Sequence, residues 1–237
     1  MRSPRQSLGI RQEVLNMNYR GVLFDFNGTL FFDSEKHKEA WQIFLPEKLG
    51  IEITEEEIRK NCLGQSNPQI LTRYFGADLS HSEIDRLAYE KEALYRSLCK
   101  KDEKTFLLVK GAEAYFDHLK ELGIPFTIAT GSEIENVKFY FEEFNIGRWF
   151  SLDRMVWDDG VIPSKPNPEL YLRAAEKIGV PASECLIFED SNSGVKAARN
   201  ANAHAIVQLV EKDGDPLYEG TALTARDFTD IAAFDAL

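Results

Sequence analysis

Several short apolar runs recur along the chain, each rich in valine, isoleucine or phenylalanine. None of them alternates strictly between apolar and polar residues, which is typical of strands covered on both faces of a parallel sheet. These runs predict strands at residues 21–26, 126–130, 153–157, 185–190 and 204–208.

Apolar residues at helical spacing lie between the predicted strands. Residues 112–122 show this spacing, and Ser132 with Glu135 has the pattern of a capping box, which predicts that a helix begins there. Asn167 followed by Pro168 predicts another helix start. Because strands and helices alternate in this way, the pattern predicts a doubly wound α/β fold with a parallel sheet.

Residues 36–104 break this rhythm, because helical patterns follow one another there without a strand. A helix is predicted from Lys36 to Leu45, ending at Pro46, and further helix starts are predicted at Thr54, Asn67 and Ser80. An all-helical insertion after the first strand predicts a cap domain. We therefore expect a helical cap at 36–104, a sheet domain at 19–35 and 105–237, and hinges near 32–36 and 104–110.

The first 18 residues are basic and polar and contain no apolar stretch of the kind found in secretory signals. We interpret residues 1–18 as a loose leader. Met17 is an alternative start of the natural protein, with the residues before it an upstream extension.

Composition and charge narrow the functional classes. The 237 residues carry 28 Lys and Arg against 39 Asp and Glu, a net charge of −11, which disfavours a nucleic-acid or anionic-membrane binder. The 3 cysteines are far apart and form no CxxC pair, so we expect reduced thiols rather than disulfides or a zinc site. No apolar run is long enough to span a membrane, and we expect a cytoplasmic protein.

Polar residues follow the first two predicted strands directly. Asp25 ends one apolar run and precedes the tight turn at Gly28. Thr130, Gly131 and Ser132 follow another run, and their hydroxyl and backbone N–H groups at a predicted helix start form a natural phosphate cradle. In an open α/β sheet, ligands bind at this carboxyl edge of the strands.

Two later segments add charge to the same edge. Lys165 lies between two prolines, which fix the backbone and the direction of the ammonium group. Glu189 and Asp190 end a buried strand, and two adjacent acids there repel each other unless a cation is near. The oxygen ligands of Asp25 and Asp190 suit Mg²⁺.

The order and spacing of these four segments resemble the haloacid dehalogenase superfamily. The similarity covers about residues 19–237 and is greatest to the branch with a helical cap, which includes β-phosphoglucomutase-like phosphatases. The resemblance implies a Rossmann-like core with an inserted α-helical cap. It also implies a Mg²⁺-dependent phosphatase that hydrolyses a small, sugar phosphate-like phosphomonoester through an aspartyl phosphate.

The resemblance also implies roles for individual residues. Asp25 matches the nucleophile, Thr130 the residue that binds a phosphoryl oxygen, and Lys165 the residue that neutralises the transferring group. The implied metal ligands are Asp25, Asp190, the main-chain carbonyl of Asn27, and Glu189 as a ligand or a partner beside the ligands.

Asn27 departs from the family pattern, in which the phosphatases carry an aspartate as general acid and base at this position. An amide cannot exchange a proton usefully at neutral pH, and losing such a group typically costs about 10²–10⁴ in rate. Three interpretations stay open. The asparagine is a natural variation in a slow phosphatase or one that acts on good leaving groups, it was introduced to trap a complex, or it partly deamidates before Gly28.

The predicted cap contains further candidate substrate ligands. His37 lies where the family has a hinge histidine, whereas Trp41 fits the cap core better than a substrate contact. Gln65 and Asn67 lie in a stretch similar to the substrate loop of the sugar-phosphate enzymes. In that loop a basic residue grips a second phosphate, but this chain has Asn67, which disfavours a mutase.

These observations leave one leading function and two alternatives. We expect a phosphatase acting on a small phosphorylated metabolite, working as a monomer without a nucleic-acid or membrane partner. A phosphosugar mutase of the β-phosphoglucomutase type is the alternative enzyme. A non-catalytic phosphometabolite binder, which keeps the metal site but has lost turnover, is the alternative from a different class.

Overall fold

The computed structural model describes residues 17–62 and 64–237. They form two compact units, one of Asp33–Leu107 and the other of the residues up to Phe32 together with Leu108–Leu237. The predicted leader, residues 1–18, lies outside the described residues except for its last two positions. No helix in the described part of the chain combines the length and apolarity that a membrane span needs.

The larger unit is built on a parallel sheet of 6 strands in the order β3-β2-β1-β4-β5-β6. This order confirms the predicted doubly wound, Rossmann-like α/β fold. The chain changes direction across the sheet between β1 and β4, which is the place where ligands bind in such folds. The strands are β1 (Gly21–Phe24), β2 (Phe126–Glu133), β3 (Val156–Asp158), β4 (Cys185–Glu189), β5 (Ala205–Leu209) and β6 (Leu223–Ala225).

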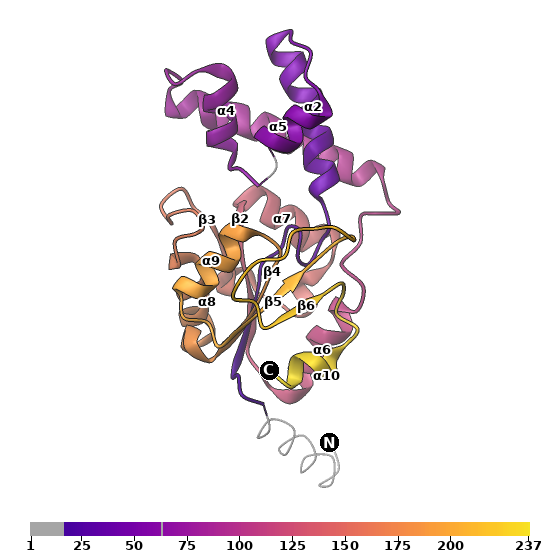
Figure 1. Cartoon of the computed structure of the whole chain (residues 1–237), viewed down its shortest axis with the longest axis vertical. Helices are drawn as coiled ribbons and strands as arrows, with labels where there is room; N and C mark the ends of the chain where they lie inside the picture. Colours follow the sequence, from indigo (N-terminus) through magenta and orange to yellow (C-terminus); the bar gives the residue numbers. More distant parts are fainter. Residues whose placement is uncertain (1–16, 63) are drawn as a thin grey trace. The chain divides into compact units, whose positions relative to one another are not determined.

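The helices of this unit pack on both faces of the sheet, which explains why its central strands are apolar throughout. On one face, Leu23 and Ile187 pack with residues of α8 and α9, which lie beside each other in Figure 1. On the other face, the rings of Phe24 and Phe188 stack 5.1 Å apart among further aromatic rings from α6 and α10. The helices are α6 (Ala112–Leu122), α7 (Ile134–Glu143), α8 (Glu169–Ile178), α9 (Asn192–Asn200) and α10 (Ile231–Asp235).

The boundary between β2 and α7, which matters for the site, differs from the one that the sequence predicts. Strand β2 continues to Glu133, and α7 begins at Ile134 without a side-chain cap, so the predicted capping box of Ser132 and Glu135 is wrong. The Ser132 hydroxyl instead donates a hydrogen bond to the side-chain oxygen of Asn27 (2.7 Å). A contact with a distant residue thus takes the place of the local cap. Neither β6 nor α10 was predicted from the sequence.

The described residues of the smaller unit, 33–62 and 64–107, form four helices, and the sequence pattern predicts four helix starts there. The predicted capping boxes at Thr54 and Ser80 are both present. Pro46, however, lies inside the first helix, which continues to Leu49 and ends at Gly50 in the left-handed conformation. Trp41 is buried in the apolar core of this unit, as expected. The helices are α2 (Ser34–Leu49), α3 (Glu55–Asn61), α4 (Asn67–Phe75) and α5 (His81–Lys101).

Candidate active site

Two neighbouring parallel strands bring the candidate acids together. Phe24 of β1 pairs with Phe188 of β4, so Asp25 and Glu189, the next residues along each strand, lie at the same carboxyl edge. The Asp25 N–H donates to the Phe188 carbonyl (3.0 Å), which fixes the main chain at that point. The sheet therefore places carboxylates from two distant segments side by side.

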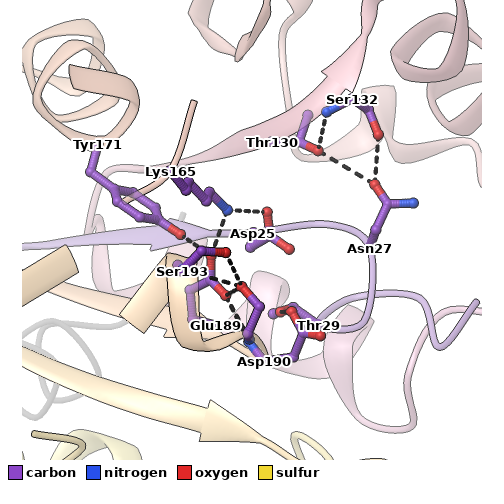
Figure 2. A network of polar contacts seen from close by, with 12 residues as sticks. Asp25, Asn27, Thr29, Thr130, Ser132, Lys165, Tyr171, Glu189, Asp190 and Ser193 are labelled. Carbon is purple, nitrogen blue, oxygen red and sulfur yellow. Dashed lines mark hydrogen bonds and ion pairs between the residues drawn. The ribbon is translucent and has the colours of Figure 1, made fainter. Parts of the chain in front are cut away.

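Lys165 lies between these two carboxylates (Figure 2). Its Nζ is 2.7 Å from Asp25 Oδ1 and 2.5 Å from Glu189 Oε1. The side chain comes from the loop between β3 and α8, and it is largely buried, so the ammonium reaches the sheet edge away from bulk water. Lys165 is thus held between two buried carboxylates rather than solvated at the surface.

Burial and charge shift the proton affinities of these groups in different directions. Burial raises the pKa of Asp25 to about 7, although the Lys165 ammonium opposes this change. Burial also disfavours the charged form of Lys165, but Asp25 and Glu189 outweigh it and raise the lysine pKa above its usual value. For Glu189, burial is outweighed by Lys165 and by hydrogen bonds, so its pKa is lowered. Lys165 therefore opposes the effect of burial on both carboxylates, and only for Glu189 is the net shift of the pKa downward.

Glu189 is held by hydrogen bonds on both of its oxygens. Oε1 accepts from Tyr171 Oη (2.6 Å) as well as from Lys165, and Oε2 accepts from the backbone N–H groups of Asp190 (2.9 Å) and Ser191 (3.0 Å). At Gly194 in α9, an added Cβ would collide with the Glu189 carboxylate. Glu189 thus contacts Lys165, Tyr171 and the loop that follows β4.

Tyr171 and Ser191 are site residues that the sequence analysis missed. Tyr171 is completely buried in α8, and its hydroxyl points to Glu189 in Figure 2, while Ser191 also caps α9 through a hydrogen bond from the Gly194 N–H (3.0 Å). A tyrosine on the apolar face of a helix has the sequence signal of a core residue, so no local pattern could have identified Tyr171. Ser191 was visible in the sequence only as part of the segment that follows Glu189 and Asp190, with no role of its own.

Asp190 completes an acidic cluster that can hold a metal ion. One ligand oxygen from each of Asp25, Glu189 and Asp190 lies within 4.8 Å of the others. Thr29 Oγ1 donates to Asp190 Oδ1 at 3.4 Å, and Gly28 has a positive φ of 75° where a Cβ would run into the Asp190 carboxylate. The ligand atoms of the three acids are carboxylate oxygens, the ligand type that Mg²⁺ prefers. The residues present therefore fit the predicted cation.

The Asn27 amide is oriented at both ends. Its Oδ1 accepts from Ser132 Oγ (2.7 Å) and, at longer range, from Thr130 Oγ1 (3.4 Å), as Figure 2 shows. Its Nδ2 donates to the hydroxyl of Tyr140 (2.8 Å), whose buried ring stacks on Phe26 with centroids 4.3 Å apart. The amide is thus part of a defined network. Tyr140 is another residue that the sequence analysis did not single out.

The observed arrangement of Thr130, Gly131 and Ser132 differs from the predicted phosphate cradle. Gly131 and Ser132 lie in β2 rather than at a helix N-terminus, and the Ser132 N–H donates to Thr130 Oγ1 (3.1 Å). Gly131 is exposed. The structure therefore brings Thr130 and Ser132 together beside Asn27, whereas the expected pair of helix-terminal N–H groups is absent at these two residues.

Comparison with known proteins identifies the family. The family model of haloacid dehalogenase-like hydrolases matches residues 19–202. The chain belongs to this family. The matching family model and the observed fold both agree with the resemblance inferred from the sequence motifs, so the predicted family is confirmed.

Named relatives and solved structures of this hydrolase family cover most of the chain. It is 27% identical to fructose-1-phosphate phosphatase YqaB of Escherichia coli (79% of this chain, 95% of the relative). It is 26% identical to the phosphorylated carbohydrates phosphatase of Thermotoga maritima (85% and 91%). Among solved structures, a family IA, variant 3 hydrolase from Entamoeba histolytica has a TM-score of 0.83 and 32% identity, covering 92% of this chain and 97% of that one.

The helical unit of this hydrolase contains a buried polar cluster of its own, centred on Lys91. Lys91 Nζ lies 2.7 Å from Glu92 Oε1 and 2.8 Å from His37 Nδ1, and the lysine is only 1% exposed. The His37 ring stacks on that of Tyr95 (3.9 Å). The Asn67 amide donates to Glu92 Oε1 (2.9 Å).

Two of the three candidate substrate ligands predicted for the helical unit belong to this cluster. His37 and Asn67 both belong to it, while Gln65 is exposed in the loop before α4. Sequence reasoning missed Lys91 and Glu92, which lie on the inner face of α5 where apolar residues are the usual occupants. The roles of His37, Gln65 and Asn67 in substrate binding stay predictions.

Proposed function

We propose that this chain is a Mg²⁺-dependent phosphoric monoester hydrolase that removes phosphate from a small, sugar phosphate-like metabolite through an aspartyl phosphate on Asp25. Relatives across the family are named as phosphatases, including phosphatases of fructose 1-phosphate and of phosphorylated carbohydrates. Membership of the family and the acidic cluster support a metal-assisted reaction.

The observation that carries the proposal is the position of Lys165 between Asp25 and Glu189. A buried cation beside a carboxylate at the switch point of the sheet favours attack of that carboxylate on a phosphate, because the ammonium can attract both negatively charged groups. A structural ion pair alone would not need a third acid, Asp190, within reach of the same point.

Each residue then has a defined task in the mechanism. The Asp25 carboxylate attacks phosphorus, Lys165 neutralises charge on Asp25 and the transferring group, and Glu189 holds Lys165 in place. Thr130 hydrogen-bonds a phosphoryl oxygen, and Ser132, whose hydroxyl donates to Asn27 Oδ1, orients the Asn27 amide. Mg²⁺ held by Asp25, Asp190 and the residue 27 carbonyl, with Glu189 beside them, supplies positive charge to the phosphoryl group when bound.

Two alternatives remain with different support. A non-catalytic phosphometabolite binder is favoured by one observation, the amide of Asn27 where the family phosphatases carry a proton-transferring aspartate. A phosphosugar mutase has less support, because it must hold a second phosphate, and Asn67 donates its hydrogen bond to Glu92 instead of offering a positive charge.

A phosphate-release assay tests the proposed function. The wild-type protein, Asp25→Asn, and the exposed control Asp78→Asn are each incubated with a panel of phosphomonoesters, with Mg²⁺ or with a chelator. We expect Mg²⁺-dependent release by the wild type and the control, and loss of release by Asp25→Asn. Release that survives in Asp25→Asn would exclude the aspartyl-phosphate route, and no release from any ester would favour the binder.

A further inference from the structure

The Asn27 network restricts the substrates on which the proposed phosphatase can act. In phosphoryl transfer to Asp25, the bond between phosphorus and the substrate oxygen breaks, and the electron pair leaves with that oxygen. A simple alcohol is a poor leaving group as an alkoxide, so a positioned acid normally delivers a proton to it. The family phosphatases carry this acid at the position that Asn27 occupies here, so the side chain at position 27 bears on which oxygens can leave.

Asn27 is fixed as an amide by its neighbours. Its oxygen accepts hydrogen bonds from the hydroxyls of Ser132 and Thr130, and its nitrogen donates to Tyr140 (2.8 Å). An amide nitrogen holds its hydrogens too firmly to act as a general acid. In this arrangement the Asn27 amide links Ser132, Thr130 and Tyr140 by hydrogen bonds and does not transfer a proton.

The described acids around Asp25 are committed to other tasks. Both oxygens of Glu189 accept hydrogen bonds, from Lys165 and Tyr171 on one side and from the loop N–H groups on the other. Asp190 belongs to the acidic cluster and accepts from Thr29. Each of these carboxylates is placed as an acceptor of hydrogen bonds or as a cation ligand, which is opposite to the task of a proton donor.

We propose that the chain is selective for phosphate groups carried on acidic oxygens, namely acyl, enol, aryl or anomeric phosphates, and acts poorly on phosphates of ordinary alcohols. This inference rests on the proposed function. The leaving oxygen departs as a stabilised anion and takes its proton from solvent. In the second step, water attacks the aspartyl phosphate, the bond from phosphorus to Asp25 breaks, and the proton of the water passes to solvent or to the released phosphate.

The second step lacks a positioned base for the same reason, so it is expected to be slow and common to all substrates. The quantity that reports on the leaving group is kcat/KM, which covers the steps up to the first irreversible one. A fast release of the first leaving group followed by a slower steady state is the expected sign of an accumulating phosphoenzyme.

The test measures kcat/KM at saturating Mg²⁺ for substituted phenyl phosphates of graded leaving-group acidity. Acetyl phosphate, glucose 1-phosphate, glucose 6-phosphate and glycerol phosphate extend the series. The wild type is compared with Asn27→Asp and with Asn202→Asp, which makes the same change of charge at an exposed position. The mass of the peptide containing residue 27 checks that the wild-type side chain is still an amide.

We expect a steep dependence on leaving-group acidity in the wild type and in Asn202→Asp, with a burst of the first product. Asn27→Asp should compress the ratio of aryl to alkyl rates by on the order of 10²-fold and remove the burst. Equal wild-type rates for aryl and alkyl phosphates would overturn the inference while leaving the phosphatase in place, and would indicate another proton donor. No release from any substrate, the phenyl phosphates included, would overturn the proposed function itself.

Discussion

Lys165 Nζ lies 2.7 Å from Asp25 Oδ1, although the two residues are 140 positions apart in the sequence. The contact exists because the loop before α8 reaches back over the carboxyl end of β1, and Glu189 at the end of the neighbouring strand holds the same ammonium. Asp25, Lys165 and Glu189 come from three segments, and the fold brings their charged groups together at the switch point of the sheet. The predictions below test this arrangement and the units around it.

Gly194→Ala should reduce activity by displacing Glu189. Alanine normally stabilises a helix by about 1 kcal/mol relative to glycine. At this position its Cβ would collide with the Glu189 carboxylate, and overpacking typically costs about 1–3 kcal/mol. We therefore expect a net loss of stability and a lower kcat, measured by denaturant unfolding and phosphate release. Lys196→Ala, an exposed change in the same helix, should leave both unchanged; equal behaviour of the two variants would contradict the positioning role of Glu189.

Asp25→Asn should stabilise the metal-free protein at alkaline pH. Burial raises the pKa of Asp25 to about 7, from an ordinary value of 3.8. Between these values the folded state binds more protons than the unfolded state, so the wild type loses stability as pH rises. The substitution removes this loss. With chelator present, we expect Asp25→Asn to exceed the wild type by at least about 1 kcal/mol at pH about 8, with a smaller difference at pH about 5. A difference that grows toward low pH would show that the sign is wrong.

Glu92→Gln should destabilise the helical unit. Lys91 and Glu92 are both buried, and their charged groups are 2.7 Å apart. Removing one partner leaves a buried charge without compensation, which typically costs about 3–5 kcal/mol. Chemical unfolding, followed by tryptophan fluorescence to which Trp41 in the same core contributes, measures this loss. Glu56→Gln, an exposed change in α3, should alter stability by less than about 0.5 kcal/mol. A similar small effect of Glu92→Gln would mean that the buried pair adds nothing to stability.

The cysteines should resist alkylation in the native protein. All three are buried, and burial raises the pKa of Cys99 and of Cys185 to about 12. Because the thiolate is the reactive form, a raised pKa lowers its fraction at any given pH below that value. We expect little modification by iodoacetamide at pH about 8 in buffer and complete modification in denaturant. Rapid native modification of Cys99 or Cys185 would contradict their packing.

The sequence predicted the architecture well because its signals there are local. Strands buried on both faces are apolar throughout, as in β1 and β4, and polar residues directly after them mark the ligand edge. Capping boxes at Thr54 and Ser80 depend on residues three positions apart, so they too could be predicted and are present.

The features that the sequence could not predict depend on contacts between distant segments. Ser132 looked like a helix cap, but its hydroxyl bonds to Asn27, 105 positions away. Tyr171 and Tyr140 have the pattern of core residues, and only the fold shows that their hydroxyls reach Glu189 and Asn27. A buried tyrosine gives the same sequence pattern whether its hydroxyl bonds to a residue of the candidate site or to any other polar group.

The central claim is that phosphate passes through Asp25, and chemical trapping tests it most directly. The wild-type protein is mixed with Mg²⁺ and an aryl phosphate, quenched in acid within the burst, and reduced with borohydride, which converts an aspartyl phosphate to homoserine. Peptide mass spectrometry then locates the converted residue, with Asp78 as an internal control. The account predicts homoserine at position 25 and unchanged aspartate at position 78. Burst release of the aryl product with intact aspartate at position 25 would contradict it.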